Sequence, residues 1–140
     1  MTKSIASASA VISATPAEVW HALTTPEMVR EYMFGTEVHT DWKKGSEIRF
    51  TGEHDGHPYE DKGTIETIAP RKCLAFTHSG SMSGDPDAPE DRHLVTYQLE
   101  RSGRRTKITV SEENVPTEKL EACSNNWAKA LDGLKKLVAH

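Results

Sequence analysis

The sequence is short of cysteine, of net positive charge and of long apolar stretches, and each shortage removes a class of protein. Its 140 residues carry a formal net charge of −4, which argues against a general binder of the phosphate backbone, so no nucleic-acid partner is expected. No apolar run approaches the roughly 20 residues that cross a bilayer, so no membrane span is expected. With only two cysteines, the chain forms one disulfide at most.

The sequence also lacks the short motifs that mark several kinds of enzyme. It has no nucleophile elbow, no glycine-rich phosphate loop and no repeated cysteine or histidine spacing typical of a metal site. Motifs therefore assign no catalytic residue, no metal ligand and no cofactor.

The two cysteines are predicted to lie apart. Leu74 and Phe76 alternate on the core side of one strand, so Cys73 points to the opposite side. Cys123 lies on the apolar stripe of the last helix, so no disulfide is expected, which fits a reducing compartment. Residues 3–12 are too polar for a secretion signal and read as an edge strand, which makes the cytoplasm the expected location.

A short helix is predicted directly after this first strand. Pro16 suits its first turn, Thr15 is placed to cap it, and Glu18 favours the positive end of its dipole. Val19, Trp20 and Leu23 recur at helical spacing as its buried stripe. Pro26 ends this helix and opens a second short one, predicted over 26–32.

Antiparallel strands are predicted through the middle of the chain, separated by glycine-containing turns. A long helix follows Pro116, with Thr117 predicted as its N-cap and with Trp20, Leu131 and Leu134 assigned to the structural core. The order of elements predicts an α+β helix-grip domain over residues 1–140, a curved antiparallel sheet wrapped around a long C-terminal helix. The strands are expected near residues 36–43, 47–54, 60–68, 72–78, 93–101 and 106–113.

Alternation along the strands predicts what lies on the inner face, because residues two apart share a face. Each strand supplies apolar residues to that face and a polar residue toward one end. Because hairpins bring strand ends together, these polar residues are expected at the mouth of a cavity. An apolar chamber with a few convergent polar groups is typical of a small-molecule site. The predicted lining, and hence the predicted ligand-binding set, is Phe50, His54, Tyr59, Phe76, His78, His93, Tyr97, Glu112, Cys123 and Trp127.

One segment, residues 79–91, is too rich in Gly, Pro, Ser and Asp for a strand and too long for a tight turn. It is either a mobile hairpin loop or a lid at the cavity mouth with Met82 as its apolar contact.

Four blocks along the chain resemble the START or birch-pollen-allergen (SRPBCC) superfamily, and within it the C-terminal domain of the activator of the heat-shock-protein-90 ATPase. The blocks are Ile12–Glu27, Asp41–Ser46, Gly63–Leu74 and Trp127–Leu134. The resemblance implies the helix-grip fold and a cavity roofed by the last helix. It leaves function open, because the superfamily hosts lipid carriers, cyclases, hormone receptors and co-chaperone modules. His78 stands where the family often has tryptophan, and Glu112 where it often has histidine.

Three functions follow as hypotheses, and the sequence favours the first. The protein binds a small apolar or amphipathic molecule, as a carrier or sensor; or it is a cyclase or dehydratase using His, Tyr and Glu groups in the cavity; or it contacts a chaperone. The last has least support, because the resembling co-chaperone domain is one part of a longer protein. A metal site made of His54, His78, His93 and Glu112 would need all four side chains to point inward at the same end of the sheet, and no metal site is expected. An exposed edge strand makes a weak homodimer an open alternative.

Overall fold

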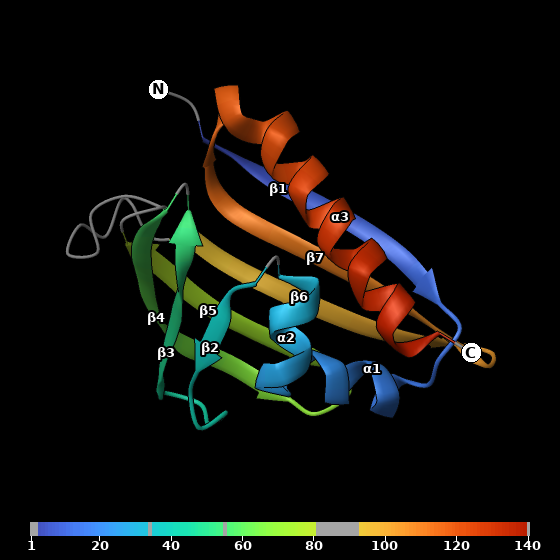
Figure 1. Cartoon of the computed structure of the whole chain (residues 1–140). Helices are drawn as coiled ribbons and strands as arrows, with labels where there is room; N and C mark the ends of the chain where they lie inside the picture. Colours follow the sequence, from blue (N-terminus) through green and yellow to red (C-terminus); the bar gives the residue numbers. More distant parts are fainter. Residues whose placement is uncertain (1–2, 34, 55, 81–92, 140) are drawn as a thin grey trace.

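The computed structural model describes residues 3–33, 35–54, 56–80 and 93–139, with the side chains of residues 3, 54, 79 and 80 left aside. Its strands form one antiparallel sheet of seven, in the order β1-β7-β6-β5-β4-β3-β2 (Figure 1). The strands are β1 (Lys3–Ile12), β2 (Glu37–His39), β3 (Glu47–His54), β4 (His57–Ala69), β5 (Cys73–Gly80), β6 (His93–Ser102) and β7 (Arg105–Pro116).

The helices lie on one side of this curved sheet. Two short helices, α1 (Pro16–Leu23) and α2 (Pro26–Tyr32), connect β1 to β2. The long helix α3 (Leu120–Val138) crosses the sheet diagonally and packs against β1 and against α1 and α2 (Figure 1). This arrangement confirms the predicted α+β helix-grip fold.

Helix α1 begins as its sequence predicts. Thr15 accepts a hydrogen bond at Oγ1 from the Glu18 backbone N–H (3.2 Å), and Glu18 Oε1 accepts one from the Thr15 backbone N–H (3.0 Å). This reciprocal pair is a capping box, which satisfies two N–H groups that the first helical turn leaves without partners. Pro16 occupies the first turn, where no donor is needed.

The start of the last helix differs from the prediction. Residues Thr117–Lys119 form a short 3-10 helix, η2, and α3 begins at Leu120 without a side-chain cap. Thr117 is therefore not the N-cap of α3, and the predicted cap is wrong. Its hydroxyl lies 2.9 Å from that of Ser4, so it links the start of β1 to the residue that follows β7 instead.

Two strand boundaries also differ. The strand expected over 36–43 covers only Glu37–His39, because Trp42 has a left-handed backbone (φ 60°) that a strand cannot continue through. Conversely, β4 starts earlier than expected, at His57, because Gly56 (φ 79°) turns the chain tightly enough for His54 to pair with His57.

The core lies between the inner face of the sheet and the helices. Residues predicted to point inward are almost fully buried, among them Ile48, Ile65, Val95 and Ile108. A bulge shifts the β4–β5 register between Ile65 and Thr67. Because this bulge lies past Ile65, it leaves the inward positions from Tyr59 to Ile65 on one face. Leu131 and Leu134 of α3 close the core, as assigned, whereas Trp20 is only partly buried against it.

Both cysteines are free thiols, in agreement with their predicted separation. Within the residues described, none of the helices combines the length and the apolar character that a bilayer crossing requires.

Candidate functional site

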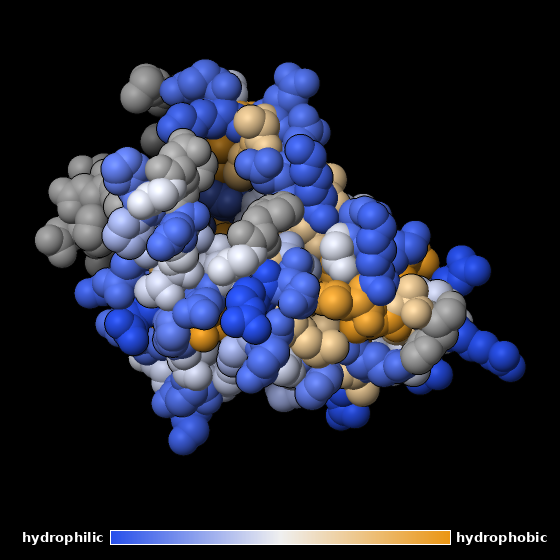
Figure 2. Space-filling model, viewed as in Figure 1, coloured by the Kyte–Doolittle hydropathy of each residue, from blue (hydrophilic) through white to orange (hydrophobic). Residues whose placement is uncertain are grey.

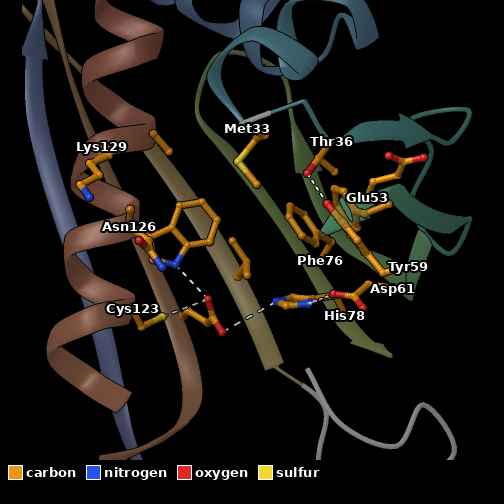
Figure 3. Close-up of a pocket in the computed structure, with 15 residues that line it drawn as sticks. Met33, Thr36, Glu53, Tyr59, Asp61, Phe76, His78, Cys123, Asn126 and Lys129 are labelled. Carbon is orange, nitrogen blue, oxygen red and sulfur yellow. Dashed lines mark hydrogen bonds and ion pairs between the residues drawn. The ribbon is translucent and has the colours of Figure 1, made fainter. Parts of the chain in front are cut away.

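A cavity of about 600 Å³ lies between α3 and the strands β3, β4 and β5. Figure 2 shows the surface hollowed there, and Figure 3 shows Cys123 and Asn126 of α3 on one side of the cavity and Phe76, Tyr59 and Asp61 of the strands on the other. The lining residues are Met33, Thr36, Phe50, Glu53, Tyr59, Asp61, Phe76, His78, Val95, Glu112, Cys123, Asn126, Trp127, Lys129 and Ala130.

The register of the strands brings the cavity groups together. Phe50 of β3 pairs with Asp61 of β4, and Gly52 pairs with Tyr59. On the other side of the cavity, Val95 of β6 pairs with Glu112 of β7. The cavity walls therefore come from alternate positions on neighbouring strands, as the period of a strand dictates.

Glycine makes room for a polar aromatic side chain at one end of the cavity. A Cβ atom added to Gly52 would lie 2.8 Å from the hydroxyl of Tyr59, so a larger residue there would displace the Tyr59 ring from its place across β3. The hydroxyl of Tyr59 then reaches Thr36 Oγ1 at 2.6 Å (Figure 3). This bond ties the residues after α2 to the sheet.

Aromatic rings form the apolar part of the wall. The rings of Phe50 and Phe76 have centroids 5.3 Å apart, and those of Phe76 and Tyr97 are 6.3 Å apart. The rings of Tyr97 and Trp127 are nearly perpendicular, with their centroids 5.8 Å apart. Such pairs stabilise one arrangement of the rings beyond the burial of their area.

Four ionisable side chains form a polar cluster at one end. Asp61 Oδ2 lies 3.6 Å from His78 Nδ1, and His78 Nε2 lies 3.8 Å from Glu112 Oε2 (Figure 3). The same Glu112 oxygen lies 2.7 Å from His93 Nδ1. The rings of His78 and His93 stack with centroids 5.3 Å apart. We call Asp61, His78, His93 and Glu112 the acid–histidine cluster.

Glu112 is the centre of this cluster. Besides the two histidines, its Oε1 accepts a hydrogen bond from Trp127 Nε1–H at 2.9 Å and one from the Cys123 thiol at 3.4 Å. Burial alone raises the pKa of Glu112, but the contact with His93, the electrostatic interaction with His78 and the Trp127 N–H lower that pKa by more. Glu112 is therefore an ionised acceptor at neutral pH although its side chain is nearly buried.

Cys123 shows the opposite effect. Burial, together with the negative charge of Glu112, raises the pKa of the Cys123 thiol to about 12. At neutral pH this sulfur is a protonated thiol and a weak nucleophile. Its place in the cavity is that of a hydrogen-bond donor and an apolar filler.

The structure brings together most of the residues predicted to line a ligand site. Tyr97 and His93 lie just behind the lining, Tyr97 beneath Trp127 and His93 stacked against His78. The side chain of His54 lies outside the described part of the structure, as do residues 81–92, which hold most of the predicted lid and Met82. The predicted residues that do line the cavity are Phe50, Tyr59, Phe76, His78, Glu112, Cys123 and Trp127.

Sequence reasoning missed several lining residues. Asp61 carried a usable signal, since it shares its strand face with Tyr59 and Ile65. Met33 and Thr36 lie where α2 ends and before β2 begins, and an irregular segment has no periodicity to read. Asn126 and Lys129 are exposed residues of α3 that border the cavity from outside the apolar stripe.

The cavity combines two kinds of surface. Rings and aliphatic groups offer an apolar wall, while the acid–histidine cluster and the Tyr59–Thr36 pair offer hydrogen-bonding groups at its ends. Imidazole and carboxylate groups in contact also have the chemistry needed to move protons or to hold a metal ion.

Comparison with known proteins gives the chain a family. No curated protein matches it. The family described as "Activator of Hsp90 ATPase homolog 1-like protein" matches residues 13–139. The solution structure of ChR145 from Cytophaga hutchinsonii is 40% identical, with a TM-score of 0.81 over 98% of this chain and 95% of that one.

More distant structures share the fold. The Aha1 dimer from Colwellia psychrerythraea is 21% identical, with a TM-score of 0.75 over 96% of each chain. DynU16, described as a putative protein in the dynemicin biosynthetic locus, is 19% identical, with a TM-score of 0.77 over 94% of this chain and 46% of its own. The match over residues 13–139 confirms the resemblance drawn from the four sequence blocks. The chain belongs to the family of Activator of Hsp90 ATPase homolog 1-like proteins, in the START or birch-pollen-allergen superfamily.

Proposed function

We propose that this protein binds a small, largely apolar or amphipathic molecule in the cavity between α3 and the sheet. The observation that carries the proposal is the cavity itself. Its volume of about 600 Å³ falls among those of small-molecule sites, which are concave, mostly apolar and supplied with a few polar groups. The aromatic wall and the acid–histidine cluster give it both features.

The distribution of groups also defines the kind of ligand. An apolar body fits against Phe50, Phe76 and Met33. At the cluster, the carboxylates of Glu112 and Asp61 accept hydrogen bonds, so a hydroxyl, amine or other N–H group is favoured there. An anionic head group would meet the ionised Glu112 and be repelled.

The proposal is tested by titrating the protein with N-phenyl-1-naphthylamine, a neutral apolar dye that fluoresces when it leaves water. Two partly buried methionines at α2 provide a matched pair of variants, because Met33 lines the cavity whereas Met28 packs elsewhere against the core. Met33→Glu places a charge in the apolar wall and is expected to weaken dye binding at least tenfold, since burying an unpaired charge is costly. Met28→Glu should change the affinity by less than about twofold.

Two results would count against the proposal. The first is the absence of saturable binding to the folded wild-type protein. The second is equal weakening by both substitutions, which would mean that the dye samples a loosened core rather than the cavity. Circular dichroism of each variant establishes that it is folded before the affinities are compared.

An enzymatic role is the second candidate, and the acid–histidine cluster is the observation that favours it. A carboxylate touching two imidazoles supplies groups for general acid–base chemistry of the cyclase or dehydratase type. Under this hypothesis, His78→Ala or Glu112→Gln abolishes turnover of a bound substrate while its affinity stays nearly unchanged. Loss of affinity in step with turnover would assign the cluster to binding.

A chaperone partner is the third hypothesis, and it comes from the family description rather than from a feature of this structure. It makes the opposite prediction about variants. Exchanging surface charges such as those of Arg30 and Glu37 would change a chaperone's ATPase stimulation, whereas Met33→Glu would not. The cavity hypothesis expects the reverse sensitivity.

A weak homodimer remains a proposal as well. Strand β1 is at one edge of the sheet and exposes Ile5 and Val11, by 61% and 43%. An unpaired apolar edge is a template for pairing with a second copy. Sedimentation velocity at increasing concentration tests this, and Ile5→Lys should keep the chain monomeric if β1 is the contact.

A further inference from the structure

Three side chains of the acid–histidine cluster place ligand atoms for a metal ion close together. One potential ligand atom from each of His78, His93 and Glu112 lies within 4.8 Å of the other two. They come from three successive strands of the sheet, since His78 of β5 pairs with His93 of β6, and Glu112 of β7 pairs with Val95, two residues along. Because the sheet fixes all three backbones, these atoms meet without help from a loop.

The spacing is close to what a metal ion needs. Zinc binds imidazole nitrogen and carboxylate oxygen at about 2.0–2.2 Å, so ligands on a tetrahedron lie about 3.3 Å apart. The His78–Glu112 separation of 3.8 Å is slightly wider and the His93–Glu112 separation of 2.7 Å slightly narrower than this. Side-chain movements of about half an ångström would bring both separations to that value around one ion.

The surrounding groups hold the ligands in the orientation that a metal requires. Asp61 Oδ2 faces Nδ1 of His78, which leaves Nε2 directed at the site. Trp127 and Cys123 both donate to Oε1 of Glu112, which leaves Oε2 for an ion. A carboxylate behind a metal-binding histidine, and a hydrogen bond on the second oxygen of a metal-binding carboxylate, are regular features of such centres.

His93 supplies an independent observation. Its Nδ1 is buried and, although Glu112 Oε2 is 2.7 Å away, that oxygen is not aligned with the ring nitrogen as a hydrogen bond demands. Leaving a buried polar atom without an aligned partner costs free energy, and native structures seldom do so without a reason. A metal ion bound by both atoms, once they move apart to about 3.3 Å, would give Nδ1 a partner.

We propose that His78, His93 and Glu112 bind one divalent transition-metal ion of the zinc type. Two imidazoles and one carboxylate suit Zn²⁺, Fe²⁺ or Co²⁺ better than Mg²⁺ or Ca²⁺, which prefer oxygen ligands alone. Since His78 and Glu112 line the cavity, the remaining coordination position opens onto it. An oxygen or nitrogen atom of a bound molecule would occupy that position. The site thus adds a metal contact to the cavity and does not depend on the identity of any ligand.

The test is a titration of metal-free protein. The protein is freed of metal with EDTA and passed through a desalting column. Zn²⁺ binding is then measured by calorimetry, and Co²⁺ binding by its visible absorption, which is strong only in tetrahedral sites. We expect one ion per chain with a Kd below about 10 μM, at least a hundredfold weaker binding in His78→Ala, and about tenfold weaker binding in Asp61→Asn.

Exposed histidines provide the controls. His39→Ala and His57→Ala remove imidazoles outside the cavity and should leave the affinity unchanged. The proposal is overturned if folded wild-type protein binds no ion, if His78→Ala binds as tightly as wild type, or if a surface variant alone abolishes binding. If His78→Ala does not fold, the Co²⁺ spectrum of the wild type and the metal affinity of Asp61→Asn decide whether the proposed site binds the ion. The dye titration described above is run in EDTA, so its outcome stays separate from this one.

Discussion

The hydrogen bond between Trp127 and Glu112 is the contact that fixes α3 to the polar end of the cavity, and removing it has a calculable effect. Trp127→Phe keeps an aromatic ring beneath α3 but deletes the indole N–H that donates to Glu112 Oε1 at 2.9 Å. Glu112→Leu removes the acceptor and leaves an apolar side chain of similar size. Each single change also has side effects, so the double variant is needed to isolate the bond.

The expected coupling follows from burial and charge. Trp127 is 8% exposed and Glu112 9%, so water does not replace either partner once the other is gone. A hydrogen bond to a charged group contributes about 1.5–3 kcal/mol to stability, and a buried partner left alone costs a similar amount. We therefore expect the two single variants together to lose about 2 kcal/mol more than the double variant does.

Urea unfolding followed by far-ultraviolet circular dichroism measures these free energies. With a denaturant slope of about 2 kcal/mol per molar urea, a loss of 2 kcal/mol lowers the midpoint by about 1 M. The control is the cycle of Trp20→Phe with Glu112→Leu, because Trp20 lies on α1 away from the cluster. A Trp127–Glu112 coupling below about 0.5 kcal/mol, or one equal to the control, would refute the buried hydrogen bond.

Three further predictions concern single residues. Gly63→Ala should lower the free energy of unfolding in urea by at least about 3 kcal/mol, since the new Cβ would overlap the backbone carbonyl of Thr77. Gly133→Ala is the control: its Cβ would meet Tyr32 Cα at an ordinary 3.5 Å, so the better helix former should raise stability by up to about 1 kcal/mol. Cys123 should react with iodoacetamide at pH 8 at least about a hundredfold more slowly in native than in urea-unfolded protein, as peptide mass mapping measures. The raised pKa of Cys123 also stabilises the folded protein. This contribution is complete below the unfolded pKa near 9 and is lost as the pH rises toward about 12. Equal rates in the two states would contradict the buried thiol. Thr15→Ala should cost about 1 kcal/mol of stability through loss of the capping box, and no change in the urea midpoint would contradict it.

The buried face of the sheet was predictable, because successive side chains of a strand point to opposite faces. Ile48, Ile65 and Ile108 are buried as their alternation requires. No sequence pattern predicted the β4 bulge. It lies beyond Ile65, so the residues of β4 that line the cavity keep their predicted orientation. A bulge two residues earlier would have turned Asp61 and Tyr59 outward.

The cavity was only partly predictable, because alternation gives the face of a residue but not its depth. His93 and Tyr97 point inward as expected, yet other rings cover them, so they support the lining rather than form it. Met33 and Thr36 reach the cavity from a connection whose path depends on tertiary packing, including the bond from Thr36 to Tyr59. The contact between His78 and Glu112 depends on register across three strands, which single-strand periodicity does not contain.

Ligand uptake beneath α3 is the central claim, and the indole N–H signals of the protein report on it directly. The chain has three tryptophans, each giving one such signal in a ¹H–¹⁵N correlation spectrum. As N-phenyl-1-naphthylamine is added, we expect the Trp127 signal to shift progressively and saturate at one dye per chain, while the Trp20 signal stays in place. Saturable dye binding that leaves the Trp127 signal unmoved would contradict ligand uptake beneath α3.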